Sequence, residues 1–145
     1  MLSAQTAGGT AFPAEQSEIG WVGLRTTPAA ADDPLFGGFP ESFESFEWHH
    51  YRFDLPPGAV LLAANEINQA FRVGRNAWGT QFHIEVEGGM VREWLVIGAP
   101  DALAHGVDID AVRSETDAKW MRHAEIAAEM ARRFVEVVRA YRPAR

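Results

Sequence analysis

The chain has 145 residues, of which 47% are hydrophobic and 23% are charged, so it is long enough for one globular domain with a buried core. Its 13 Lys and Arg against 20 Asp and Glu give a net charge of −7, which argues against binding to nucleic acid or to an anionic membrane surface. The absence of cysteine excludes disulfides, thiolate metal sites and cysteine catalysis within the chain. We find no signal-peptide pattern and no apolar run long enough to span a bilayer, and therefore expect a cytoplasmic protein.

The first part of the chain predicts a short helical piece, a loop and several strands. Residues 1–18 predict the helical piece followed by loop, and residues 19–24 predict a strand. Residues 26–40 are rich in Pro, Ala, Asp and Gly and predict a surface loop. Alternating apolar side chains predict a strand over 45–51, and an apolar run predicts a buried strand over 59–63.

A hairpin and two short helical segments are expected next. Residues 68–73 and 77–83 flank Gly74-Arg75-Asn76, which is the pattern of two strands joined by a tight turn. Such a turn joins antiparallel strands. A helix is predicted over 90–97, and a connection with one more helical turn over 99–110.

From Asp110 to Tyr141 apolar residues recur at steps of three and four, which predicts one long amphipathic helix. Its expected core-facing stripe is Trp120, Ala124, Ala127, Met130, Phe134, Val138 and Tyr141. Pro143 lies beyond the helix end, where it does not interrupt the hydrogen bonds. Strands followed by helices favour an α/β fold, with an antiparallel hairpin at one edge of the sheet.

The residues with the clearest chemical meaning are His83 and Glu85, at the end of the second hairpin strand. If the strand runs through them, both side chains lie on one face. A carboxylate beside an imidazole fixes its tautomer and stabilises the imidazolium, which is the base-and-orienter half of a catalytic triad. The other half requires a nucleophile, and the chain contains no cysteine.

Several segments resemble class I glutamine amidotransferases of the GMP-synthase-like kind, in that family's order and spacing. They are Glu18–Trp21, Trp48-His49 with Phe53–Ala59, Asn68–Arg72 and Gly79–Glu85. The resemblance implies a partial flavodoxin-like α/β sheet over residues 1–107, which would be the C-terminal part of such a domain. Residues 108–145 would then be a helical extension that packs on it.

In this family a cysteine attacks the side-chain amide of glutamine, and a thioester and ammonia result. The resemblance implies that His83 is the general base, that Glu85 orients it, and that Gln5 and His49 belong to the substrate site. It further implies glutamine or another γ-glutamyl compound as substrate, a synthetase that receives the ammonia, and no cofactor.

The sequence departs from the family at the nucleophile. The family motif Gly-x-Cys-Leu-Gly-x-Gln aligns with Met1–Gln5 so that Met1 stands at the cysteine, and Ile84 replaces a proline between the His and the Glu. A thioether cannot act as the thiolate nucleophile, so we predict that the chain as written does not form the thioester.

Three interpretations remain open. The first is a degenerate or truncated glutamine amidotransferase domain, and the second is a pseudoenzyme that binds a partner or forms a homodimer. The third is a γ-glutamyl peptidase-like hydrolase that uses a nucleophile supplied from elsewhere. A start site assigned too late, or a nucleophile lost from a truncated gene, is an explanation that competes with all three.

The other histidines predict no metal site. Neighbouring strand residues point to opposite faces, so His49 and His50 do not share one ion, and we expect His50 to be solvated. We expect His105 and His123 at the surface. The acidic residues near 45–51 predict a solvated strand face: Glu41, Glu44 and Glu47.

Overall fold

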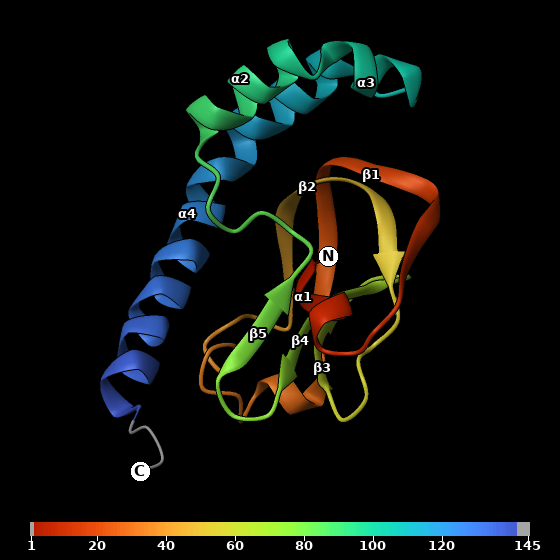
Figure 1. The fold of residues 1–145 in the computed structure, drawn as a ribbon. Helices are drawn as coiled ribbons and strands as arrows, with labels where there is room; N and C mark the ends of the chain where they lie inside the picture. The colour runs from red at the N-terminus through yellow and green to blue at the C-terminus, as the bar shows by residue number, and fades with distance from the viewer. Residues whose placement is uncertain (1, 142–145) are drawn as a thin grey trace.

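The computed structural model describes residues 2–141. Its strands are β1 (Ala11–Thr26), β2 (Ser42–Phe53), β3 (Val60–Ala64), β4 (Asn68–Val73) and β5 (Ala77–Thr80). Its α-helices are α1 (Leu2–Thr6), α2 (Gly88–Ile97), α3 (Ala99–Ala104) and α4 (Ile109–Ala140), and a short 3-10 helix spans Pro28–Ala30. The strands form one curled sheet, with α2, α3 and α4 along one side (Figure 1). The predicted α/β fold with an antiparallel hairpin and a long C-terminal helix is confirmed.

The sheet has the strand order β2-β1-β3-β4-β5, and every neighbouring pair is antiparallel. The predicted hairpin is present as β4 and β5, in which Val73 faces Ala77. Gly74 has a φ of +58°, a left-handed conformation that glycine adopts without steric cost, so the tight turn forms where the sequence placed it.

Several strand boundaries differ from the prediction, and β2 extends over Ser42–Phe53 instead of 45–51. β1 begins at Ala11, well before residue 19, because it continues to pair with β2 at Ala11↔Phe53 despite an irregularity between Pro13 and Glu18. β5 ends at Thr80 instead of reaching residue 83. Local propensity gave the right strands but not their ends, which depend on the partner strand.

The segment over 26–40 is a loop with many exposed residues, as predicted, but it is anchored to the core by buried side chains. Leu35 and Phe36 are buried, and the buried carboxylate of Asp33 accepts hydrogen bonds from both of their backbone N–H groups. Arg72 and the indole of Trp78 also donate to this carboxylate. The aspartate therefore satisfies the backbone of the loop and joins it to the β4–β5 hairpin.

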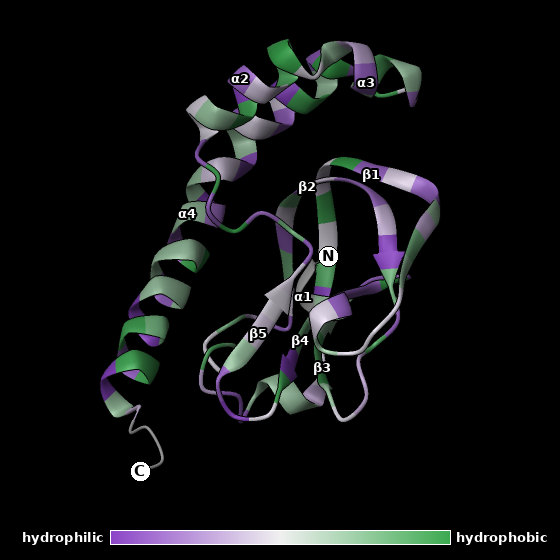
Figure 2. Cartoon of the chain, in the orientation of Figure 1, coloured by the Kyte–Doolittle hydropathy of each residue, from purple (hydrophilic) through white to green (hydrophobic). Residues whose placement is uncertain are grey.

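The core has two main clusters, and α4 contributes to both. One lies between the sheet and the middle of α4: Leu24, Ala30, Leu35, Phe36, Phe43, Leu62, Ala63, Ala70, Phe82, Ile126 and Met130. The other lies beneath α2: Trp21, Phe46, Val86, Val91, Leu95 and Val112. The alternation of apolar and polar residues along these elements is visible in Figure 2.

Helix α4 begins where predicted, because the carboxylate of Asp108 accepts from the backbone N–H groups of Asp110 and Ala111. Its buried face consists of Val112, Thr116, His123, Ile126 and Met130. The predicted stripe is wrong at its end: Phe134, Val138 and Tyr141 are more than half exposed. The last turns of the helix diverge from the sheet, so none of the elements within residues 2–141 covers them (Figure 1).

His123 is buried at 1% exposure, contrary to the expectation of a surface residue, whereas His105 is exposed as expected. The imidazole of His123 meets the ring of Trp21 edge-on, at 5.3 Å between centroids. This side chain is part of the interior beneath α4. Among residues 2–141 no helix combines the length and the apolar character needed to cross a bilayer.

Candidate active site

His83 and Glu85 form a hydrogen-bonded pair in a turn just after β5. The backbone N–H of His83 donates to the carbonyl of Phe46 at 2.9 Å, which fixes the residue against β2. The chain then turns, and Glu85 Oε1 comes within 2.8 Å of His83 Nδ1. His83 and Glu85 are therefore in contact, as predicted. The turn brings them together, and not a shared face of a strand, as the prediction assumed.

The His83 ring lies in a shallow pocket of about 410 Å³ at the junction of the sheet with α2. The pocket is lined by Trp48, His83, Trp94, Ile97 and Gly98. The Trp94 ring meets the imidazole edge-on at 4.9 Å. Because Nδ1 is held by Glu85, Nε2 is the nitrogen that can accept a proton from a substrate or nucleophile.

His49 belongs to a second, more buried polar cluster. Its Nε2 lies 2.9 Å from Glu18 Oε2 and 3.3 Å from Glu47 Oε2. The amide nitrogen of Gln81 lies 3.1 Å from His49 Nδ1 and donates to the carbonyl of Tyr51 at 2.8 Å. Glu47 is fully buried, so the expectation of a solvated acidic face is wrong for this residue, whereas Glu41 and Glu44 are exposed.

The charges of this cluster depend on one another. Burial alone would lower the pKa of His49, but its contacts with Glu18 and Glu47 outweigh burial and raise that pKa to about 9. Burial raises the pKa of Glu47 to about 7, although His49 opposes the rise. Burial would raise the pKa of Glu18 too, but the hydrogen bonds from His49, Asn65 and Gln69 lower it. The cluster therefore favours a protonated His49 beside an ionised Glu18.

The predicted substrate residues do not line the His83 pocket. Gln5 is exposed on α1, and His49 points into its own carboxylate cluster. His50 was expected to be solvated, but it is only partly exposed and its Nε2 lies 3.1 Å from Asp101 Oδ2. The structure thus joins His83 with Glu85 and places His49 and His50 outside this pair.

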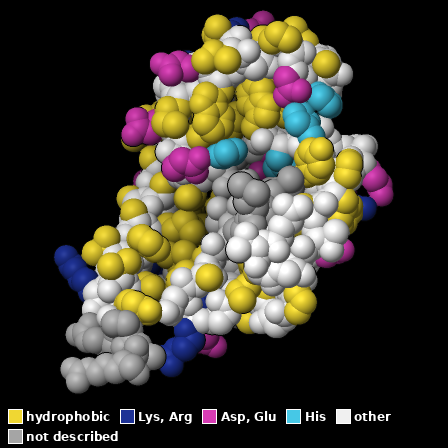
Figure 3. Space-filling view, viewed as in Figure 1, with side chains coloured by type: hydrophobic (Ala, Val, Ile, Leu, Met, Phe, Trp, Pro, Cys, Tyr) yellow, Lys and Arg dark blue, Asp and Glu magenta, His cyan; other side chains and the backbone are white. Residues whose placement is uncertain are grey.

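Sequence reasoning missed the aromatic walls of the pocket. Trp48 directly precedes His49 in the Trp-His segment that resembles the family, so the sequence could have indicated that Trp48 lies near the active site. Trp94 and Gly98 come from α2 and its end, and only the folding of α2 back over the sheet places them at His83. Figure 3 shows histidine and acidic side chains gathered where the helical layer meets the sheet.

No family model matches the chain, but known proteins are similar to it in sequence and in fold. A glutamine-hydrolysing GMP synthase from Thermomicrobium roseum is 37% identical over 87 residues, which are 59% of this chain and 16% of that protein. A glutamine amidotransferase structure from Thermotoga maritima superposes with a TM-score of 0.82 at 25% identity, over 92% of this chain and 57% of the other. A glutamine amidotransferase from Methylobacillus flagellatus superposes with a TM-score of 0.81 at 28% identity, over 98% of this chain and 60% of the other.

These similarities in sequence and fold support a GMP-synthase-like domain of the class I glutamine amidotransferase kind. It spans only part of each relative, less than two thirds of either solved chain and 16% of the GMP synthase.

Proposed function

We propose that this chain supplies the base and the orienting carboxylate of a glutamine amidotransferase active site. His83 is the base, and Glu85 is the group that orients it. The observation that carries the proposal is the 2.8 Å contact between His83 Nδ1 and Glu85 Oε1, beside a pocket into which the ring faces. The family relationship supports glutamine, or another γ-glutamyl compound, as the substrate.

In the proposed reaction His83 Nε2 takes the proton of a cysteine thiol, and the thiolate attacks the amide carbon of glutamine. The C–N bond breaks, His83 returns the proton to the departing nitrogen, and ammonia leaves. Water activated by the same nitrogen then hydrolyses the thioester to glutamate. Glu85 keeps the imidazole in the Nδ1–H tautomer and stabilises its charged form throughout.

The cysteine that this scheme requires is not among the 145 residues. We therefore propose that the chain alone does not hydrolyse glutamine, and that the activity needs a thiol supplied by another segment or subunit. The expected result is no ammonia release by the purified chain above that of a heat-denatured sample. Release that disappears in His83→Ala would contradict this proposal.

A chimaera tests the roles of His83 and Glu85 directly. The part of the Methylobacillus flagellatus protein that this chain does not cover is joined to it, and ammonia release from glutamine is measured. In an active chimaera, His83→Gln should lower kcat by about 10²–10⁴. Glu85→Gln should lower kcat less, and Glu44→Gln, an exposed acidic control on β2, should change little. Equal activity of the His83→Gln and parent chimaeras would overturn the assignment of the base.

The chain alone provides a test that does not need turnover. Nitrogen-15 NMR of the imidazoles reports which ring nitrogen carries the proton. We expect His83 as the Nδ1–H tautomer in the wild type and a mixture of tautomers in Glu85→Gln. A mixture already present in the wild type would contradict the orienting role of Glu85.

The substrate class separates the amidotransferase from the γ-glutamyl peptidase interpretation. The active chimaera is offered glutamine and a γ-glutamyl dipeptide under identical conditions. Faster release of ammonia from glutamine than cleavage of the dipeptide supports the amidotransferase proposal. Cleavage of the dipeptide without glutamine hydrolysis would favour the peptidase.

A second candidate function is association through an apolar groove. The groove, of about 520 Å³, lies between α4 and the turn after β5, and Figure 3 shows apolar side chains along it. Ile84, Val86, Trp120 and Phe134 are among its lining residues, and Phe134 is 52% exposed. We propose that a second copy of the chain covers this groove, because burial of such a surface stabilises a dimer.

Light scattering after size exclusion tests the dimer. Phe134→Glu should produce a monomer, whereas Met121→Glu should leave the dimer intact. Met121 is an equally exposed apolar residue of α4 that does not line the groove. A monomeric wild type would refute the homodimer.

A further inference from the structure

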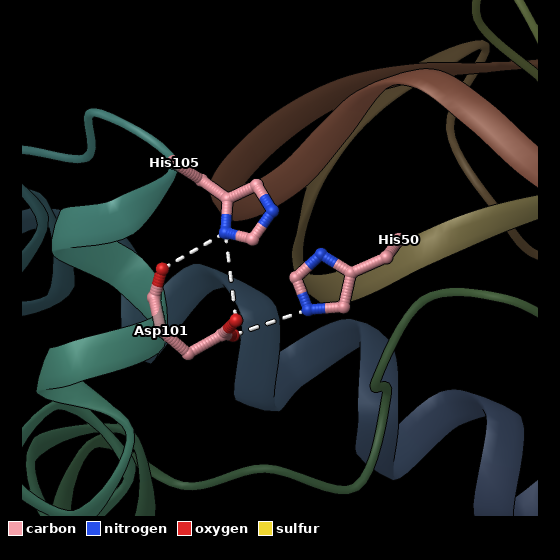
Figure 4. A group of neighbouring side chains, drawn as sticks. All are labelled: His50, Asp101 and His105. Atoms are coloured by element: carbon pink, nitrogen blue, oxygen red, sulfur yellow. Dashed lines mark hydrogen bonds and ion pairs between the residues drawn. The ribbon is translucent and has the colours of Figure 1, made fainter.

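His50, Asp101 and His105 form a cluster of potential metal ligands (Figure 4), and the indole of Trp48 donates to its aspartate. His50 comes from β2, whereas Asp101 lies in the first turn of α3 and His105, four residues later, is its C-cap. One ligand atom from each of the three lies within 4.8 Å of the others. Helix α3 therefore brings two side chains to a strand residue about fifty positions earlier in the chain.

The spacing of these atoms fits a small divalent cation. His50 Nε2 is 3.1 Å from Asp101 Oδ2. His105 Nδ1 is 3.4 Å from Asp101 Oδ1 and 2.9 Å from the backbone carbonyl oxygen of Asp101, and a bound ion would take the place of the proton that Nδ1 donates to this carbonyl. Tetrahedral Zn²⁺ has bonds of about 2.0–2.1 Å to nitrogen and oxygen, which place neighbouring ligand atoms about 3.3 Å apart. The two imidazole rings lie 4.5 Å apart between centroids, so both reach the same small volume.

The residues around the cluster orient its ligands as outer groups do in metal sites. Ser17 Oγ contacts His50 Nδ1 at 2.7 Å, which leaves Nε2 as the nitrogen that faces Asp101. The indole of Trp48 donates to Asp101 Oδ2 at 2.8 Å and fixes the carboxylate. In metal sites, the ring nitrogen of a histidine that does not bind the metal is usually hydrogen-bonded to another group. A carboxylate ligand usually accepts a hydrogen bond as well.

All three side chains are accessible to solvent. His50, Asp101 and His105 have side-chain exposures of 35%, 39% and 40%. A cation can therefore enter without opening the core, and water can complete its coordination. Two neutral imidazoles and one carboxylate suit zinc and its neighbours in the first transition series, whereas calcium and magnesium prefer oxygen ligands alone.

We propose that His50, Asp101 and His105 bind one divalent transition-metal ion, of which Zn²⁺ is the representative, with water at the open position. The ion joins α3 to β2 and holds the Trp48 side of the His83 pocket. None of its ligands lines the pocket at His83, so the metal site and the proposed base are separate sites.

Calorimetric titration of the tag-free 145-residue chain with Zn²⁺ tests the site. We expect saturable binding of one ion per chain and a rise in the thermal midpoint as zinc is added. Co²⁺ should bind in place of Zn²⁺ and give visible absorption bands of a low-coordinate nitrogen–oxygen site. The absence of saturable binding would overturn the proposal.

Variants assign the ligands. His50→Ala and His105→Ala should each weaken zinc binding by at least about tenfold and remove the cobalt bands, and Ser17→Ala should weaken it by about tenfold or less. The matched control is His83→Gln, which removes a histidine of similar exposure that also has a carboxylate neighbour, and it should bind zinc as the wild type does.

Circular dichroism of each variant separates loss of a ligand from loss of the fold, and His105 at the exposed end of α3 is the safest site to alter. Zinc binding unchanged in a folded His105→Ala would overturn the proposal. Loss of binding in His83→Gln alone would place the ion at His83 and Glu85 instead.

Discussion

The indole Nε1 of Trp48 donates a 2.8 Å hydrogen bond to the Oδ2 atom of Asp101. The same indole forms a wall of the His83 pocket, so helix α3 positions a side chain of the candidate active site without reaching it. Because Trp48 lies on β2 and Asp101 on α3, this contact couples the sheet to the helical layer.

Replacing Trp48 by Phe should loosen α3. The phenyl ring keeps an apolar wall at the pocket but cannot donate to Asp101, whose carboxylate then loses a fixed partner. We expect faster hydrogen exchange of the α3 amides and little change in α2, measured by mass spectrometry. Trp94→Phe, on the opposite side of the same pocket, should leave exchange in α3 as it is. Equal exchange in both variants would show that the hydrogen bond does not hold α3.

Gly98 lies between α2 and α3 and packs closely against its neighbours. A Cβ at this position would overlap the Trp48 ring, 2.6 Å from its Cη2 atom, and approach the backbone carbonyl of Trp94 at 3.0 Å. Gly98→Ala should therefore lower the free energy of unfolding by about 1–3 kcal/mol, measured by urea denaturation.

The matched control is Gly89→Ala, in the first turn of α2. A Cβ on Gly89 meets nothing within 4 Å, so alanine should be tolerated and should stabilise the helix by about 0.5–1 kcal/mol. Equal stability of the two variants would mean that the Trp48 ring moves away without cost.

Local patterns in the sequence predicted the parts of the fold that local forces determine. Gly74 marks the hairpin because its turn needs a left-handed residue, and Asp108 starts α4 because its carboxylate caps free N–H groups. The contact between His83 and Glu85 could also be predicted from the sequence, because side chains two residues apart can meet in either a strand or a turn.

Tertiary contacts determine what the sequence did not predict. His123 is buried because Trp21 and the turn after β5 cover that side of α4, whereas Phe134 is exposed because the helix diverges from the sheet there. His50 meets Asp101 only after α2 and α3 fold back over β2. The domain boundary expected at residue 107 also depends on tertiary contacts, because Ile126 of α4 lies in one core cluster with residues of the sheet.

His49 should titrate far above an ordinary histidine. Its contacts with Glu18 and Glu47 overcome the effect of burial and raise its pKa to about 9. Because the folded pKa lies above the unfolded value of 6.5, its stabilising contribution is complete below pH 6.5 and is lost as the pH rises towards 9. NMR titration of the His49 ring should show a midpoint near pH 9 and a lower midpoint in Glu18→Gln. Glu85→Gln, at the other histidine pair, should leave this midpoint unchanged, and a wild-type midpoint near 6.5 would refute the cluster's electrostatics.

His123 should make the domain less stable in acid. Burial lowers the pKa of this imidazole, and weaker backbone contacts with Glu44, His83 and Ile84 oppose the shift. Below pH 6.5 the unfolded chain binds a proton that the folded chain excludes, so stability falls with decreasing pH until the folded pKa is reached. One such group contributes at most about 1.4 kcal/mol per pH unit.

Urea denaturation between pH 7.5 and 5 measures this slope, over a pH range chosen to bracket the ordinary histidine value of about 6.5. His123→Leu keeps an apolar side chain against Trp21 but has no proton to bind, so its stability should fall less steeply than that of the wild type. Met121→Leu, an exposed α4 substitution without a titratable group, should retain the wild-type slope. If His123→Leu keeps the full slope, His123 accepts its proton in the folded state, and the acid sensitivity must come from other groups.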